Sequence, residues 1–148
     1  MNDTRIKSSF LLALFVSFCI LQNVQVFAIH EPYDVIIASG LPNTSPLLRI
    51  HCASKDNNLG FHDLRPNEQF SWHFRMNYWW TTKFFCHFWW GSKDTAFDVM
   101  SFSFARHHCG VEKSGNKCYW LVKEDGFYFA KSGMAIPGYL EKLRDWPQ

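Results

Sequence analysis

Aromatic side chains alternate with polar ones in the middle of the chain, and this two-residue period constrains the fold most strongly. Residues Glu68–Met76 place four apolar side chains on one face and Ser71, His73 and Arg75 on the other. Residues Thr82–Trp90 are almost wholly apolar on both faces. The first pattern is typical of a strand with one solvated face, the second of a central strand covered on both faces. We therefore expect a β-sheet core built around these two segments.

Five further segments are short and rich in aromatic or β-branched residues, as strands are. They are Tyr33–Ala38, Leu47–Ser54, Phe97–Phe104, Tyr119–Lys123 and Phe127–Lys131. Turns are expected at Asn57–Gly60, Gly91–Asp94, Ser114–Asn116 and Glu124–Gly126. Asp125-Gly126 predicts a tight hairpin, and the one helical turn expected lies at Tyr139–Asp145. Strands at intervals of roughly ten residues favour an all-β fold, either an antiparallel sandwich or a small barrel.

The N-terminus has the pattern of a secretory signal, in which basic residues precede an apolar run. The run extends from Phe10 to Leu21, and Ala28 ends a tripeptide with acceptable residues at the positions that signal peptidase reads. An uncleaved anchor helix is the alternative, but the run is short for a bilayer and polar residues follow it. We predict a signal peptide over residues 1–28 and one secreted domain over residues 29–148.

The charge balance argues against strongly charged partners. The whole chain has 15 Lys plus Arg and 13 Asp plus Glu, and the 120 residues after Ala28 have a net charge of +1. So small a charge gives no long-range attraction to nucleic acid or to an anionic membrane. With 47% hydrophobic and 19% charged residues, a disordered chain is excluded. We expect no nucleic-acid partner and no membrane insertion after cleavage; the sequence leaves the oligomeric state open.

Four cysteines remain after the signal is removed, an even number in a chain that enters an oxidising compartment. They are Cys52, Cys86, Cys109 and Cys118. We expect two disulfides; three pairings are open, and our working expectation is the nested one, Cys52 with Cys118 and Cys86 with Cys109. A zinc site that joins the last two cysteines to the His107-His108 pair is the competing interpretation. Because no Cys-x-x-Cys spacing occurs and exported thiols oxidise, we expect no metal and no cofactor.

Seven histidines raise the hypothesis of an enzyme, such as a ribonuclease that uses two imidazoles as acid and base. His51, His73 and His87 fall within strand patterns, where a cross-strand role is the simpler interpretation, and His107-His108 is expected in a loop. The chain has no nucleophile elbow, phosphate-cradling glycine loop or zinc-protease motif. We therefore expect no enzymatic activity and assign no catalytic residue.

Two motifs are candidates for a surface function. The tract Tyr78-Trp79-Trp80 lies between two expected strands, where large side chains are hard to bury. Together with Phe84–Trp90 it offers aromatic faces that could stack bases or sugar rings, although a core role is simpler for most of these residues. Asn43 begins a glycosylation sequon in an expected surface loop, and Pro46 after the sequon lowers its occupancy.

Several motifs follow one another along nearly all of the predicted mature chain. They are Leu48–Gly60, Phe70–Phe74, Thr81–Phe88, Phe97–Val99, Cys109, Cys118–Trp120 and Asp125–Tyr128. In this order they resemble the plant self-incompatibility S-protein homologue family. The resemblance implies a small secreted β-sandwich with two disulfides and no known enzymatic activity. The chain departs from the family at Ala53, where a basic residue is common, and at the bulky Tyr78–Trp80 tract.

Members of that family resemble extracellular ligands, and the founding members cause rejection of self pollen through a receptor on the pollen surface. We therefore expect a secreted ligand that binds a cell-surface receptor in cell–cell recognition, with a defence effector as a further alternative. A rigid frame with variable loops is how recognition proteins place contact residues. The candidate loops are Leu41–Pro46, Asn77–Trp80, Gly91–Asp94 and Arg106–Lys117. The candidate contact residues are Arg65, Trp79, Trp80, Arg106 and His107.

Overall fold

The computed structural model describes residues 8–9, 11–17, 32–112, 115–130 and 139–148. Residues 11–17 are helical with exposed apolar side chains. Within the described ranges, none of the helices combines the length and the apolar character that crossing a membrane requires. The predicted cleavage site after Ala28 lies outside these ranges, so the signal peptide stays a prediction.

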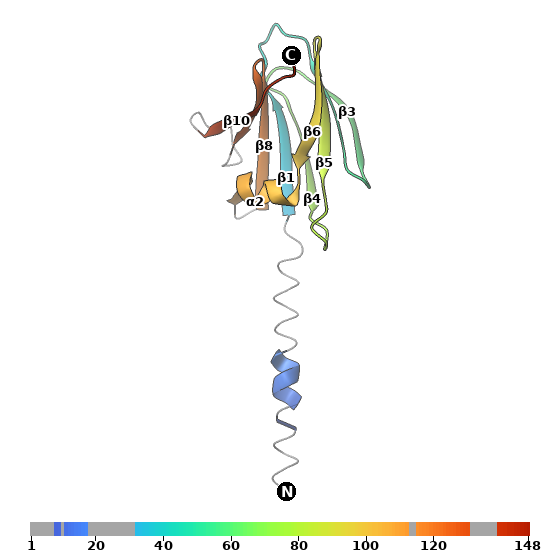
Figure 1. Cartoon of the computed structure of the whole chain (residues 1–148), viewed down its shortest axis with the longest axis vertical. Helices are drawn as coiled ribbons and strands as arrows, with labels where there is room; N and C mark the ends of the chain where they lie inside the picture. The colour runs from blue at the N-terminus through green and yellow to red at the C-terminus, as the bar shows by residue number, and fades with distance from the viewer. Residues whose placement is uncertain (1–7, 10, 18–31, 113–114, 131–138) are drawn as a thin grey trace.

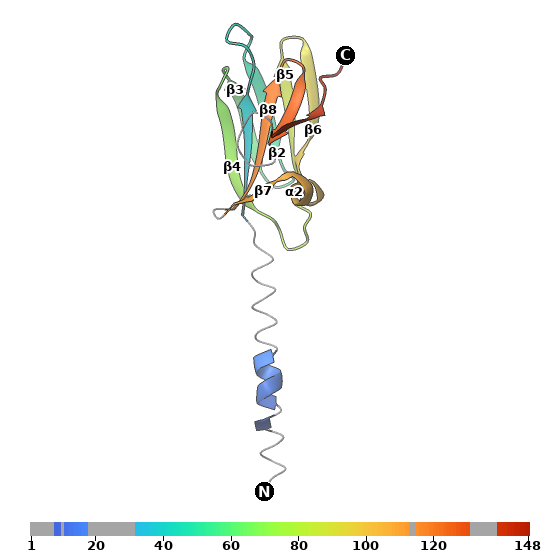
Figure 2. The same ribbon diagram turned by 90° about the vertical axis from the view of Figure 1, so that its left-hand side faces the viewer.

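Two β-sheets packed against each other form the body of the molecule (Figures 1 and 2). The strands are β1 (Pro32–Ser39), β2 (Leu48–Ala53), β3 (Asn58–Leu64), β4 (Gln69–Arg75), β5 (Phe84–Trp90), β6 (Lys93–Met100), β7 (Gly110–Glu112), β8 (Gly115–Lys123), β9 (Gly126–Ala130) and β10 (Leu140–Arg144). A six-stranded sheet has the order β10-β9-β8-β1-β4, with β7 beside β8, and a four-stranded sheet has the order β3-β2-β5-β6. The all-β sandwich is confirmed.

One strand pair departs from the expected antiparallel arrangement. The strands β1 and β8 run parallel, with Val35 opposite Cys118. A parallel pair needs a long connection, and here the chain passes through the whole four-stranded sheet before β8 returns beside β1. The other pairs between described strands are antiparallel.

Aromatic rings from both sheets fill the core. Trp120 on β8 is 2% exposed, and its indole N–H donates a hydrogen bond of 2.9 Å to the carbonyl of Val99 on β6. Its ring contacts Phe97, Phe104 and Phe129, with centroid distances of 5.4, 5.3 and 5.1 Å. Trp120 therefore joins the two sheets to α2 (Phe102–His108), the helix that covers one end of the core.

The strand β5 lies inside the four-stranded sheet, as predicted, but only one of its faces is covered. Phe84, Cys86 and Phe88 are buried in the core, whereas Phe85 is 43% exposed and His87 and Trp89 are half-buried. The prediction of cover on both faces is wrong. Of the outward side chains, His87 and Trp89 stack on each other, with ring centroids 3.8 Å apart, and no further layer of the described residues lies over them.

The segment predicted as a strand over Phe97–Phe104 changes to a helix after Met100. Ser101 is the N-cap of α2, and its Oγ accepts a hydrogen bond of 3.3 Å from the backbone N–H of Phe104. Three basic residues follow in the last turn, where the helix dipole favours positive charge. His107-His108 is therefore helical, and its placement in a loop is wrong.

Two short strands replace a predicted turn and a predicted helical turn. The turn expected at Asn57–Gly60 lies earlier, at Lys55–Asp56, and β3 begins at Asn58. The helical turn expected over Tyr139–Asp145 is β10, which pairs antiparallel with β9. The sequence patterns of both segments are weak indicators of a strand. Their structure is decided by pairing with a neighbouring strand.

The two disulfides join Cys52 to Cys86 and Cys109 to Cys118, so the nested pairing is wrong. Cys52 lies directly opposite Cys86 in the β2–β5 ladder, with Cα atoms 4.1 Å apart. Cys109 lies just before β7, whose hairpin with β8 brings it to Cys118, at 4.6 Å. The nested pairing fails because the β2–β5 register places Cys86 opposite Cys52, and the β7–β8 hairpin brings Cys109 to Cys118.

Candidate functional site

Three segments meet at one end of the sandwich. They are the β2–β3 turn (residues 54–57), the β4–β5 loop (residues 76–83) and α2. Figures 1 and 2 show the β4–β5 loop and α2 at the same end, and Figure 1 shows the C-terminus at the other end. We call this surface the α2 end. Its three segments are far apart in the sequence, between β2 and β7, and only folding brings them together.

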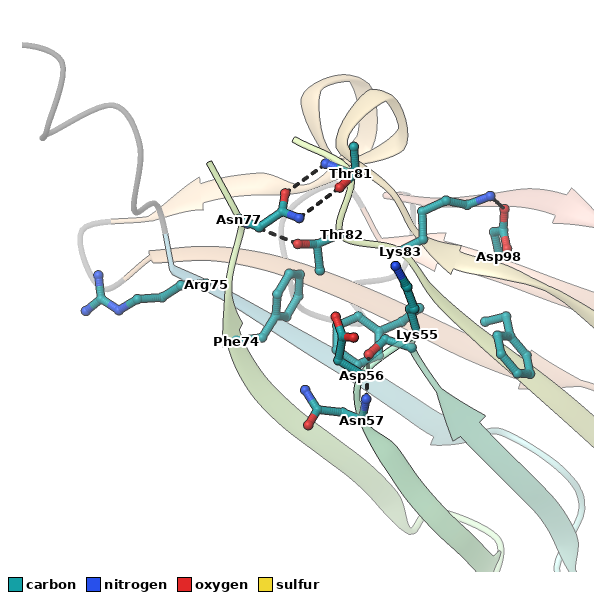
Figure 3. A pocket seen from close by; sticks show the side chains of 13 residues that line it. Lys55, Asp56, Asn57, Phe74, Arg75, Asn77, Thr81, Thr82, Lys83 and Asp98 are labelled. Carbon is teal, nitrogen blue, oxygen red and sulfur yellow. Dashed lines mark hydrogen bonds and ion pairs between the residues drawn. The ribbon is translucent and has the colours of Figure 1, made fainter. Parts of the chain in front are cut away.

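Asn77 closes the β4–β5 loop at its base (Figure 3). Its side-chain oxygen accepts a hydrogen bond of 2.8 Å from the backbone N–H of Thr81, and its amide nitrogen donates one of 2.8 Å to the Thr81 hydroxyl. The backbone N–H of Asn77 donates to Thr82 Oγ1 at 3.0 Å, and its carbonyl accepts from the N–H of Trp80 at 3.1 Å. One asparagine thus holds both sides of the loop together.

The closed loop displays two aromatic residues to solvent. Tyr78 is 57% exposed and Trp79 is 75% exposed, and their rings meet edge to face at 4.9 Å. The third aromatic, Trp80, turns inward with a positive φ of 57° and lies 4.5 Å from the ring of Phe102 on α2. Arg106 lies 5.6 Å from the same Phe102 ring. Trp80 therefore packs the loop against the helix, whereas Trp79 stays on the surface beside Tyr78.

A pocket of about 540 Å³ opens beside the loop, between the first residues of β5 and the end of β4 (Figure 3). Phe74 and Phe84 contribute apolar surface, and Lys55 and Asp56 of the β2–β3 turn line one side. On the other side Lys83 pairs with Asp98, with Nζ and Oδ2 2.6 Å apart. The lining residues that the structure describes include no histidine or cysteine. The pocket thus places charged and hydroxyl groups beside aromatic rings.

The sequence model of the family described as plant self-incompatibility protein S1 matches residues 34–146. The chain belongs to this family. Its relatives include S-protein homolog 11 of Arabidopsis thaliana, which is 38% identical over 111 residues, or 73% of this chain and 74% of the relative. S-protein homolog 24 of the same plant is 36% identical over 95 residues, or 64% of this chain and 59% of the relative. The match thus spans less than two thirds of the length of homolog 24.

One solved structure has the same fold. It belongs to a study of SPH (Self-Incompatibility Protein Homologue) proteins, described as a widespread family of small, highly stable, secreted proteins from plants. The two structures align with a TM-score of 0.55 over 80% of this chain and 97% of the other, at 16% sequence identity. The shared feature is therefore the fold.

In this S1-family chain, four of the five predicted contact residues lie at the α2 end. Trp79 and Trp80 are on the β4–β5 loop, and Arg106 and His107 are exposed residues of α2. Arg65 lies at the opposite end, where its guanidinium is 3.6 Å from Glu68. That end is fixed by the β3–β4 turn, whose Asn67 N–H donates to the carbonyl of Ser39 at the end of β1. The α2 end is therefore a surface without Arg65.

The predicted loops of this S1-family chain also lie at different places on the sandwich. Asn77–Trp80 is at the α2 end, whereas Leu41–Pro46 lies near the β3–β4 turn, where the amide of Asn67 is 3.5 Å from Asn43. Gly91–Asp94 is the reversal between β5 and β6, and Lys93 donates there to the carbonyl of Glu124. The expected Arg106–Lys117 loop is divided among α2, β7 and β8. Asn43 is exposed on its loop, and its glycosylation stays a prediction.

The sequence reasoning missed Asn77, Thr81 and Thr82, which hold the loop closed. Their signal was present, because an asparagine after a strand commonly bonds the backbone a few residues later and so closes a turn. The aromatic residues beside them led us to interpret the tract as a contact surface. The residues that hold this surface in place were therefore overlooked. The interpretation also missed Phe102, on which Trp80 packs.

Replacing Asn77 by alanine is expected to open the β4–β5 loop without unfolding the protein. The change removes both side-chain hydrogen bonds to Thr81, so amide exchange at residues 78–82 should quicken by roughly tenfold. Hydrogen exchange followed by mass spectrometry measures this. Asn57→Ala is the matched control, since Asn57 bonds Ser54 through its backbone. Equal exchange in the two variants would show that Asn77 does not hold the loop.

Proposed function

We propose that this S1-family protein is a secreted ligand that binds a cell-surface receptor through the α2 end and catalyses no reaction. The observation that carries the proposal is Trp79, which is 75% exposed on a loop that Asn77 closes at its base. Tryptophan residues are common energetic centres of interfaces, and an ordered loop loses little entropy on binding. The role is recognition between cells, which is the expectation drawn from the family resemblance.

Two features support export of the protein. The N-terminal basic and apolar pattern is that of a secretory signal, and two disulfides are typical of proteins that fold in an oxidising compartment. The SPH proteins of the similar structure are described as secreted. An extracellular location places the α2 end where a receptor on a neighbouring cell can reach it.

The arrangement of the histidine pair favours a ligand over a ribonuclease. His107 and His108 are consecutive residues of α2, so their side chains leave the helix about 100° apart. The ring of His108 stacks on Phe104 at 4.5 Å, whereas His107 is exposed. An acid and a base that act on one phosphate must both reach it, and these two imidazoles diverge.

Replacing Trp79 by alanine is expected to weaken receptor binding by about tenfold or more, since truncation of a central aromatic anchor has effects of this size. The measurement is saturation binding of labelled, disulfide-bonded mature protein to plasma-membrane vesicles from the plant that makes it. Tyr139→Ala is the matched control, because Tyr139 is an exposed aromatic residue just before β10. Binding should also be lost when the vesicles are first treated with trypsin, because the partner is a protein.

Two results would contradict the proposal. Equal affinity of the Trp79→Ala and wild-type proteins would remove the α2 end from the interface. Conversion of RNA by the purified protein, abolished by His107→Ala or His108→Ala, would make the protein a hydrolase instead of a ligand.

A further inference from the structure

The four-stranded sheet has an exposed face that the proposed receptor surface does not use. We use the term outer face for the side of β3, β2, β5 and β6 that points away from the six-stranded sheet. In the register of the strands, His51 lies opposite both Phe61 and His87. In the adjacent row Arg49 lies opposite Trp89 and Asp63. Aromatic and imidazole rings thus occupy neighbouring positions on three strands.

These rings lie nearly parallel and in contact. His51 stacks on Phe61 with ring centroids 4.4 Å apart and an angle of 19°, and His87 stacks on Trp89 at 3.8 Å and 18°. Phe61 and Trp89 are 6.0 Å apart at an angle of 33°. Phe61 is 65% exposed, so most of its ring surface outside the stack with His51 is in solvent. The stacks keep an apolar platform ordered on the surface.

Polar side chains surround the platform and are themselves held in place. Nε2 of His51 is 2.8 Å from Oδ1 of Asn58, and Nε2 of His87 is 2.9 Å from Oδ2 of Asp94. Arg49 donates two hydrogen bonds to Asp63, of 2.8 and 2.9 Å. Amide, carboxylate and guanidinium groups at fixed positions beside aromatic rings are the usual lining of a small-molecule or sugar subsite.

The charges of the outer face indicate whether a ligand that stacks on these aromatic rings is neutral or acidic. On these strands Arg49 pairs with Asp63, whereas Lys93 of β6 lies on the core-facing side and donates to the carbonyl of Glu124. Among the described residues, the outward side of these strands thus has no lysine or arginine without an acidic partner. Nucleic acids and acidic polysaccharides need such cations to neutralise their charge. A neutral ligand needs no such cations to bind.

We propose that the outer face binds a neutral polysaccharide, with pyranose rings stacked on Phe61 and Trp89 and sugar hydroxyls bonded to the surrounding polar groups. The apolar C–H face of a pyranose ring lies flat against an aromatic ring, and its hydroxyl groups point outward toward such side chains. The site is separate from Trp79 at the α2 end. A secreted protein with both surfaces could be retained on the cell wall while the receptor surface stays free.

The test uses the disulfide-bonded mature protein with two neutral probes, insoluble microcrystalline cellulose in a depletion assay and soluble xyloglucan in affinity electrophoresis. Phe61→Ala and Trp89→Ala are each expected to weaken retention by about tenfold, whereas Trp89→Phe keeps a ring and most of the binding. Trp79→Ala and Tyr139→Ala should bind as the wild-type protein does. Near-ultraviolet circular dichroism of every variant controls for folding, which these exposed positions are not expected to disturb.

Several outcomes would overturn the proposal. One is failure of both neutral probes to retain the wild-type protein, and another is equal retention of the Phe61→Ala variant. Binding to polygalacturonate or to single-stranded RNA as strong as to xyloglucan would show that charge, rather than ring stacking, governs the face. Sedimentation of a dimer that Phe61→Ala dissociates would identify the occupant as a second copy of the chain. None of these outcomes bears on receptor binding through Trp79, so the two proposals fail separately.

Discussion

Replacing Trp120 by alanine is expected to lower the free energy of unfolding by about 3–5 kcal/mol, the range typical of large-to-small changes at buried aromatic positions. Trp120 is 2% exposed and contacts rings from three different elements: Phe97 on β6, Phe104 on α2 and Phe129 on β9. Alanine would leave a cavity where the two sheets and the helix meet. It would also leave the buried carbonyl of Val99 without the indole N–H that now donates to it.

Urea unfolding followed by near-ultraviolet circular dichroism measures this loss. Trp79→Ala is the matched control, because it removes the same side chain at a position that is 75% exposed, where surface substitutions change stability by about 0.5 kcal/mol or less. A similar loss in both variants would mean that Trp120 does not hold the core together. Since domains of this size are stable by only about 5–15 kcal/mol, the Trp120 variant should also show a marked fall in its urea midpoint.

The strands that were predicted from the sequence are those in which local pattern and tertiary environment agree. In β4, alternate side chains face the core and the solvent, so a period of two residues is visible in the sequence itself. The hairpin at Asp125-Gly126 was predicted for the same reason, because turn chemistry is local, and the structure pairs Lys123 with Gly126 across it. These features require no knowledge of a distant partner.

The errors arose where a distant partner decides the structure. The helix α2 contains two phenylalanines that suit a strand, but Ser101 caps it and Phe104 packs against Trp120 of β8, in the six-stranded sheet. The strand β10 exists because it pairs with β9. The disulfide pairing follows from the register of β2 with β5, which sequence separation does not reveal. Propensity is a weak guide wherever packing across the fold favours another conformation.

The candidate site was predicted only in part for a related reason. Large aromatic residues between strands indicated the β4–β5 loop, because composition alone marks Trp79 as hard to bury. Composition says nothing about which end of the sandwich a loop occupies, so Arg65 was grouped with residues that lie at the opposite end. The outer face was predicted only in part, because Phe84–Trp90 was named as a stacking surface but His51 and Phe61 join it only through the sheet register.

Removal of the Cys52–Cys86 disulfide, by the double change Cys52→Ala and Cys86→Ala, is expected to destabilise the protein by about 4 kcal/mol. The bond closes a loop between residues that are 34 positions apart, whereas the Cys109–Cys118 bond spans 9 positions. On the chain-entropy model the shorter loop corresponds to about 3 kcal/mol. Both Cys52 and Cys86 are completely buried, so loss of their sulfur atoms also leaves a cavity in the core.

The comparison of the two double variants separates these effects. Cys109→Ala with Cys118→Ala is the matched control, because it also removes one disulfide and adds no charge, while Cys109 is only half-buried. Free energies of unfolding in urea should rank the wild type above the Cys109–Cys118 variant and that variant above the Cys52–Cys86 variant. The reverse order would mean that the β7–β8 hairpin, and not the β2–β5 ladder, limits stability. Since β2 and β5 also carry His51, His87 and Trp89, the Cys52–Cys86 variant should lose the ordered outer face together with its core.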